Sequence, residues 1–202
     1  MAEMTPPLVL FSIAVAAVFL WMWTGDYQAA RKGTPRPGAL AGATPAPVFI
    51  VALSVAVSVL IVVLECAGEY ALGIEGAQST IPWYYLFAML SAGIVEEILF
   101  RGYLVIQGRG RAALVASVVA FSIVFALVHG HFLPKGDDGA RHLSLAAGPV
   151  WWSLILFVNA LWWYFVRFSK WNPNHSLIPC FAGHMAGNLA VFAAKLLQGY
   201  VA

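Results

Sequence analysis

The chain has 202 residues, of which 61% are hydrophobic and only 10% are charged. A soluble globular domain carries about 25% charged residues, so this composition argues against a soluble protein. The formal net charge of +2 is too small for a nucleic-acid-binding surface, and no Lys/Arg cluster with interleaved aromatic residues lies outside the apolar runs. The sequence therefore predicts a membrane protein surrounded by the lipid bilayer, with no nucleic-acid partner.

Six apolar runs are long enough to cross a bilayer as helices. They are predicted at about residues 7–23, 47–66, 83–106, 112–130, 147–167 and 177–197. The first run has no Lys or Arg before it and no A-x-A-like site directly after it, so we expect a retained helix and not a cleaved signal peptide. The predicted fold is all-α, a polytopic transmembrane bundle of about six spans.

Positive charge marks one set of loops between the predicted spans. Lys and Arg occur in loops 24–46, 107–111 and 168–176, whereas loop 67–82 has none. Because short loops rich in Lys and Arg stay in the cytoplasm, we place these three loops inside the cell. Loops 67–82 and 132–146 and both termini are then outside. The predicted location is the cell membrane, as a multi-pass protein of the bacterial inner membrane.

The third predicted span contains three charged residues, Glu96, Glu97 and Arg101. Each charge inside a bilayer costs about 2.5–3.5 kcal/mol on insertion scales, so such residues usually face a protein interior or a wet cavity and mark function. Glu97 and Arg101 are four apart, in the order that favours a pair on one helical face. Glu96 points about 100° away from Glu97. We therefore predict a Glu97–Arg101 ion pair and a Glu96 that is free for another task.

Two further polar clusters lie within the spans. His129 ends the fourth span one turn after Phe125, and His184 and Asn188 lie one turn apart in the sixth. Almost every ionisable or amide group inside the spans falls in one of the three clusters, which predicts one buried site. Taken alone, each cluster also fits a structural role, as an ion pair, an interfacial histidine or interhelical hydrogen bonding.

The remaining cysteines and histidines receive no functional role. Cys66 and Cys180 fall in or beside apolar runs, so we interpret them as small buried hydrophobic residues and not as a disulfide or a metal knuckle. His131, His142 and His175 lie in loops or at the ends of spans.

The residue types of the three clusters suit one reaction. A carboxylate beside an imidazole can bind a water and take its proton. An imidazole N–H and an amide N–H one turn apart can donate to a developing oxyanion. Together these groups describe the attack of water on an amide carbonyl. The sequence has no G-x-S-x-G and no H-E-x-x-H, so serine and zincin routes lack their usual signatures.

Three motifs in this order resemble the CPBP family of intramembrane proteases, also called the CAAX-protease and bacteriocin-processing, or Abi, family. The motifs are Glu96-Glu97-x-x-x-Arg101, Phe125-x-x-x-His129 and His184-x-x-x-Asn188. The resemblance covers about residues 83–195 and implies a glutamate-dependent endopeptidase. It also implies a division into two N-terminal transmembrane helices, residues 1–82, and a catalytic four-helix core, residues 83–202.

The resemblance implies a role for each motif residue. Glu96 and His129 would activate the water, His184 and Asn188 would stabilise the oxyanion, and Glu97 and Arg101 would support the first helix of the core. Family members have also been described as metalloproteases, because Glu96, His129 and His184 could hold zinc. We favour a mechanism without a cofactor, with zinc as the alternative, since Asn is a poor zinc ligand and a good oxyanion donor.

The expected partner is a membrane-associated protein or peptide substrate. The family offers prenylated CAAX proteins, peptide precursors and membrane-anchored proteins with C-terminal sorting tails. Two other classes stay open, a non-catalytic immunity or scaffold protein of the same fold and a small metal or ion carrier. A scaffold need not keep all four of Glu96, His129, His184 and Asn188, and a carrier would string polar groups along a path. The gathered set therefore favours the enzyme.

Overall fold

The computed structural model describes residues 5–134, 136 and 139–202. These residues form six α-helices, a 3₁₀-helix and a π-helix, and within them β pairing is limited to a single bridge. The elements are α1 (Pro6–Arg31), α2 (Val48–Leu72), η1 (Glu75–Ala77), α3 (Tyr85–Glu96), η2 (Glu97–Tyr103), α4 (Arg111–Val128), α5 (Ala147–Phe168) and α6 (Ile178–Leu197). The predicted all-α fold is confirmed.

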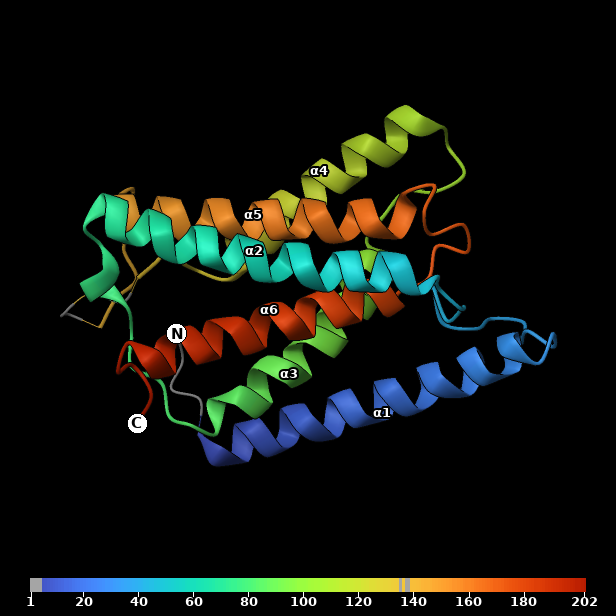
Figure 1. Ribbon diagram of the computed structural model, residues 1–202, viewed down its shortest axis with the longest axis horizontal. Helices are drawn as coiled ribbons and strands as arrows, with labels where there is room; N and C mark the ends of the chain where they lie inside the picture. The colour runs from blue at the N-terminus through green and yellow to red at the C-terminus, as the bar shows by residue number, and fades with distance from the viewer. Residues whose placement is uncertain (1–4, 135, 137–138) are drawn as a thin grey trace.

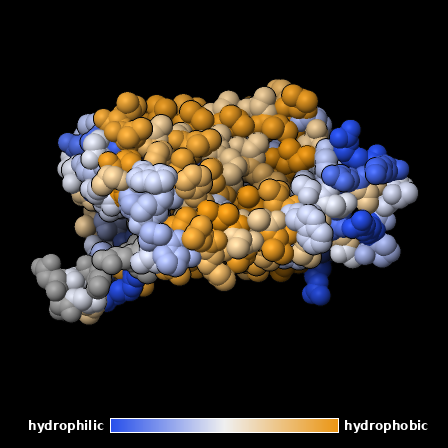
Figure 2. All heavy atoms as spheres, turned by 90° about the horizontal axis from the view of Figure 1, so that it is seen from below, coloured by the Kyte–Doolittle hydropathy of each residue, from blue (hydrophilic) through white to orange (hydrophobic). Residues whose placement is uncertain are grey.

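Five of these helices, α1, α2, α4, α5 and α6, are long and apolar enough to cross a membrane. Figure 2 shows apolar residues over the middle of one face and polar residues gathered at its two ends. Large apolar side chains such as Phe11, Leu60 and Val128 are exposed on the outside of the bundle. Apolar surface of this extent fits contact with lipid. The protein is therefore a multi-pass membrane protein, as predicted.

The remaining predicted span is built from two segments. α3 ends at Glu96 and continues directly as the π-helix η2, so the chain is helical from Tyr85 to Tyr103. A π-helical segment is wider than an α-helix and is frequent at functional sites. The sequence predicted a uniform α-helix here, and that detail is wrong. The change of geometry begins at Glu97, the first residue of the charged pair.

The first two spans are longer than predicted. α1 continues past Trp23 to Arg31, and Gly33 follows with a φ of +74° that ends the helix. The last turns of α1, which were predicted as a loop, are therefore helical. Asp26 in these turns accepts a hydrogen bond from the Leu40 N–H at 2.9 Å, which holds the following segment against the helix. α2 likewise continues to Leu72 and ends at a left-handed glycine.

The longer α2 moves Glu69 from the predicted external loop into the bundle. Its side chain is buried, and each carboxylate oxygen accepts one hydrogen bond. Trp152 Nε1 of α5 donates to Oε1 at 2.6 Å, and Gln78 Nε2 donates to Oε2 at 2.6 Å. Trp152 lies 83 residues away on another helix and Gln78 lies past the end of α2, so a hydropathy pattern alone could not reveal that the carboxylate is satisfied inside the fold.

Figure 1 shows α2, α5 and α6 lying along one another, with α1 beside α3 and α4 crossing against α5. α2 and α6 pack closely at Gly183. A Cβ atom there would overlap the Ser54 hydroxyl and lie 2.9 Å from Ser58 Oγ. The absence of a side chain therefore lets the two helices meet, as small residues do in membrane bundles.

The connections divide between two ends of the bundle. Figure 1 places the loops after α1, η2 and α5 at one end, and the loops after α2 and α4 with the C-terminus at the other. This grouping matches the predicted alternation of loops, while the side that faces the cytoplasm stays a prediction. Three charged residues of the predicted loop 132–146, Lys135, Asp137 and Asp138, lie outside the described residues. The division of the chain at residue 82 also stays a prediction.

Candidate active site

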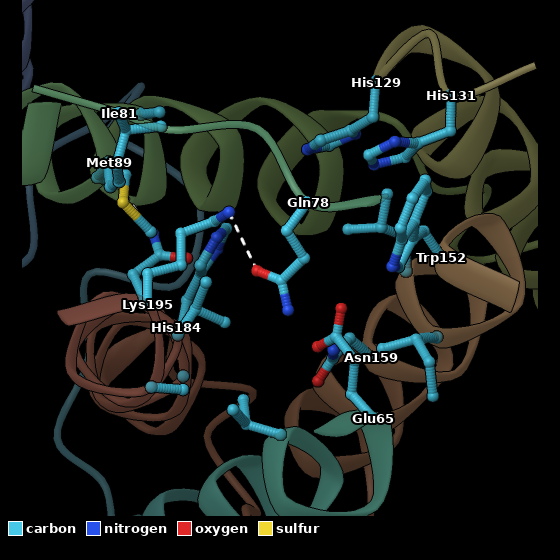
Figure 3. Close-up of a pocket in the computed structure, with 18 of the residues that line it drawn as sticks. Glu65, Gln78, Ile81, Met89, His129, His131, Trp152, Asn159, His184 and Lys195 are labelled. Atoms are coloured by element: carbon cyan, nitrogen blue, oxygen red, sulfur yellow. Dashed lines mark hydrogen bonds between the residues drawn. The ribbon is translucent and has the colours of Figure 1, made fainter. Parts of the chain in front are cut away.

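A cavity of about 530 Å³ runs between α2, α3, α5 and α6 and reaches the end of α4. Figure 3 shows part of its wall, with His129 and His184 among the side chains that surround it. The four residues predicted to be catalytic, Glu96, His129, His184 and Asn188, all line this cavity. The two supporting residues, Glu97 and Arg101, are fully buried behind the wall. The structure thus brings the three sequence clusters together.

The predicted Glu97–Arg101 pair is present and completely buried. Arg101 Nη1 lies 3.2 Å from Glu97 Oε1, and neither side chain is exposed. The guanidinium carbon lies 4.3 Å from the ring centroid of Phe125, 4.8 Å from Trp163 and 5.3 Å from Tyr164. These cation–π contacts and the Glu97 carboxylate attract the cation, although no nitrogen of the guanidinium has a hydrogen-bond partner among the described residues.

Glu97 has a second partner that the sequence did not predict. His184 Nδ1 lies 2.7 Å from Glu97 Oε1, and His184 Nε2 lies 3.7 Å from Glu96 Oε2. The imidazole also stacks on Trp163, with ring centroids 4.1 Å apart and planes inclined by 14°. Trp163 Nε1 in turn donates to Ser58 Oγ at 3.1 Å. His184 is therefore fixed at one nitrogen and on one face, with Nε2 directed towards Glu96.

His129 and Asn188 each use one polar atom to bond a backbone carbonyl. His129 Nδ1 lies 2.7 Å from Phe125 O, and its ring packs 4.6 Å from the Phe125 ring. Donation from Nδ1 leaves the Nε2 lone pair as the acceptor of the imidazole. Asn188 Nδ2 donates to Met89 O at 2.8 Å, and the amide nitrogen carries a second N–H. His129 thus keeps Nε2, and Asn188 keeps its second N–H and its amide oxygen.

Sequence reasoning missed other polar residues of the cavity wall. Glu65 and Asn159 line it, although both lie inside predicted spans, so the assignment of nearly all intramembrane polar groups to three clusters was incomplete. Both residues could have been recognised from the sequence, because a carboxylate or amide side chain inside a predicted span is rare and usually functional. His131, which received no role, also lines the cavity and packs on Trp152. Burial and the neighbouring His129 lower the pKa of His131 to about 4, so it is uncharged at neutral pH.

The donor set does not form a metal centre as it stands. The described residues contain no group of three or more His, Cys, Asp or Glu side chains placed around a common ion. The Nδ1 contacts of His129 and His184 leave Nε2 as the atom that faces a water or a metal.

An apolar helical bundle with buried glutamates and histidines around one cavity defines an integral membrane protein with an internal polar site. The family model of the Rce1-like type II CAAX prenyl endopeptidases matches residues 78–190, more than half of the chain. The protein therefore belongs to this family of membrane-embedded CAAX proteases, in agreement with the predicted resemblance, and the match includes all three motifs. No curated protein and no solved structure gives a significant match.

Proposed function

We propose that this protein is an intramembrane endopeptidase that hydrolyses a peptide bond of a membrane-associated protein or peptide with a water activated by Glu96. One observation carries the proposal. Glu96, His129, His184 and Asn188 line a single cavity in a member of this protease family. Family membership supports peptide hydrolysis, and the arrangement of the side chains supports the division of labour among them.

In the first step, Glu96 acts as the general base. Its carboxylate takes a proton from a water while the water oxygen bonds to the carbonyl carbon of the scissile peptide, and the carbonyl π electrons move to oxygen. His129, whose Nδ1 donates to Phe125 O, offers Nε2 as an acceptor to the same water. Two acceptors on one water favour the orientation in which an oxygen lone pair points at the substrate.

In the second step, His184 and Asn188 donate to the tetrahedral oxyanion. This role requires a proton on both ring nitrogens of His184, with Nδ1–H donating to Glu97 and Nε2–H to the oxyanion. Before the attack, the charges of Glu96, Glu97, Arg101 and this form of His184 cancel, and after it the oxyanion carries the negative charge that Glu96 has lost. The C–N bond then breaks, and Glu96 returns its proton to the leaving amine, so one water is consumed per bond.

The test compares Glu96→Gln with Glu75→Gln, a matched change in η1 outside the cavity wall. Each purified protein is reconstituted in liposomes with farnesylated CAAX peptides and unprenylated transmembrane peptides, and new termini are identified by mass spectrometry. We expect wild type and Glu75→Gln to cleave and Glu96→Gln to be folded but inactive. Wild-type turnover in Glu96→Gln would show that Glu96 is not the base, and no cleavage of any peptide by wild type would favour a non-catalytic scaffold.

The metal alternative is tested on the same preparation. Enzyme that has been extensively chelated and shown by elemental analysis to lack zinc should keep its turnover under the proposed mechanism. Loss of activity on chelation, followed by recovery in proportion to added zinc, would make Glu96, His129 and His184 ligands and would overturn the mechanism without metal.

A further inference from the structure

The cavity extends beyond the candidate active site to a second polar region, which we call the distal end. It lies between α2, α5, α6 and the segment before α3. Its polar residues are Glu65, Glu69, Gln78, Asn159 and Lys195, and Figure 3 shows four of them around the open space. None of these residues belongs to the three motifs, and the proposed mechanism uses none of them.

Most of the distal charge is already satisfied. Glu69 accepts hydrogen bonds from Trp152 and Gln78. Lys195 Nζ donates to Gln78 Oε1 at 2.9 Å, the dashed line in Figure 3, and to Ser79 O at 2.9 Å. Gln78 thus bridges the carboxylate of α2 and the ammonium of α6. Glu69 and Lys195 balance one another, and together they contribute no net charge to this part of the cavity.

Glu65 and Asn159 are different, because neither side chain has a hydrogen-bond or ion-pair partner among the described residues. Asn159 is nevertheless only 9% exposed. Figure 3 shows the two side chains, from α2 and α5, directed into the same part of the cavity. Both side chains line the cavity, so the hydrogen-bond partners that such enclosed polar groups need must come from what occupies it. Two unpartnered groups that face one space therefore point to a ligand that bonds both.

The chemistry of the two groups selects a cation. An ionised carboxylate only accepts hydrogen bonds, and the amide oxygen of Asn159 is a second acceptor beside Glu65. Glu69 and Lys195 cancel, so Glu65 sets the charge of the distal end, and a cation placed beside it favours its ionised form. An ammonium or guanidinium group with several N–H donors satisfies both residues. A carboxylate placed there would be repelled by Glu65.

The helix geometry sets the separation from the scissile bond. Glu69 is level with Lys195, because Gln78 bonds both, and Glu65 lies one turn nearer to His184. Lys195 is eleven positions after His184 on α6. At 1.5 Å per residue Glu65 therefore lies roughly 10 Å along the bundle from His184. An extended peptide rises about 3.3 Å per residue, so this span corresponds to about three substrate residues.

We propose that the distal end is a substrate subsite for a Lys or Arg side chain about three residues from the scissile bond, held by Glu65 and Asn159. The inference rests on the proposed function, since it places the peptide relative to Glu96 and His184. It adds a specificity that the reaction itself does not require. Glu65 and Asn159 bind the substrate in this scheme and take no part in the proton transfers.

The experiment uses membrane-anchored peptides that are identical except for Lys, Gln or Glu at the third residue before or after the cleaved bond. Their free termini are blocked, so the side chain is the sole variable charge. In wild type we expect kcat/KM to be higher for Lys than for Gln by about tenfold, and lowest for Glu. Glu65→Gln should remove this preference, and Glu75→Gln should leave both the preference and the rate on the Gln peptide unchanged.

A second measurement does not depend on turnover. The affinity of the uncleaved Lys and Gln peptides for Glu96→Gln protein should differ by the same factor, and adding Glu65→Gln should abolish the difference. Equal cleavage of all peptides would overturn the subsite and leave the proposed function intact, as would a wild-type preference for Glu. Absence of cleavage combined with a charge-dependent affinity would instead count against the proposed function alone.

Discussion

Glu97 and Glu65 are both carboxylates inside apolar helical segments, yet their surroundings are opposite. Glu97 is fully buried, and a single oxygen meets both Arg101 and His184. Glu65 faces the cavity and meets no partner within the described part of the chain. Both residues have lost much of their water, and only Glu97 has regained polar contacts from the protein.

The difference shows how a buried charge can be interpreted. A carboxylate that has charged or polar partners from other positions links segments of the fold, as Glu97 links η2 to α6 through His184. A carboxylate left open towards a cavity costs desolvation without a matching gain, and a bound ligand is the usual compensation. Burial alone does not tell a structural carboxylate from one that faces a ligand site. The distinction depends on whether the protein itself supplies polar partners.

The largest expected effect is the loss of stability when Glu97 loses the charge of Arg101. Arg101→Ala removes the cation and leaves Glu97 buried, which should lower the free energy of unfolding by about 3–5 kcal/mol. Arg36→Ala is the matched control, because Arg36 pairs with Asp26 at 3.6 Å while being 65% exposed, and such pairs contribute about 0–1 kcal/mol. Unfolding in detergent by denaturant titration measures both. Glu65→Ala should stay near wild type, and a loss as large as that of Arg101→Ala would remove the distinction between the two glutamates.

The second effect concerns turnover. Asn188→Ala removes one proposed oxyanion donor and should lower kcat by about 10²–10³ without abolishing cleavage. Asn174→Ala, an identical change outside the cavity wall, should leave kcat unchanged. Initial rates over a range of peptide concentrations separate kcat from KM. An Asn188→Ala enzyme with wild-type kcat would remove this residue from the mechanism.

The sequence predicted the parts of the site that depend on spacing within one helix. The Glu97–Arg101 pair follows from a separation of four residues, and the common face of His184 and Asn188 follows in the same way. The family resemblance added the expectation that the three motifs act together and a role for each of their residues. The contact between His184 and Glu97 could not be predicted, since it depends on how α6 packs against η2.

The boundaries of the spans also depend on contacts between segments that the sequence does not reveal. In α1, Asp26 accepts a hydrogen bond from the Leu40 N–H beyond the helix, and in α2 the buried Glu69 accepts hydrogen bonds from Trp152 and Gln78. Each of these is a tertiary contact that satisfies a polar residue, so a hydropathy pattern places the same residue in a loop. The sequence alone could have marked Glu65 and Asn159 as polar residues inside spans. Their lack of partners could be seen only in the structure.

A smaller effect tests the packing that holds α6 in place. Gly183→Ala would place a Cβ atom against the Ser54 and Ser58 hydroxyls and should cost about 1–3 kcal/mol through overpacking. Gly187→Ala, one turn later, is the control, because its nearest neighbour is Ser58 Cβ at 3.9 Å. Unfolding free energies and cleavage rates are measured for both. Equal stability of the two variants would show that α2 and α6 do not meet at Gly183.

The smallest expected effect is a loss of turnover when the Trp163 ring, which stacks on one face of His184, is removed. Stacked aromatic pairs contribute about 0.5–1.5 kcal/mol beyond burial, so loss of the Trp163 ring should lower kcat by up to about tenfold through misplacement of the imidazole. Trp163→Leu removes the ring, whereas Trp163→Phe keeps an aromatic face, and both remove the hydrogen bond to Ser58. We expect both variants to lose stability and only Trp163→Phe to retain most of its turnover. If the two lose turnover in proportion to stability, then Trp163 fills space without orienting His184, and the contact with Glu97 alone positions the ring.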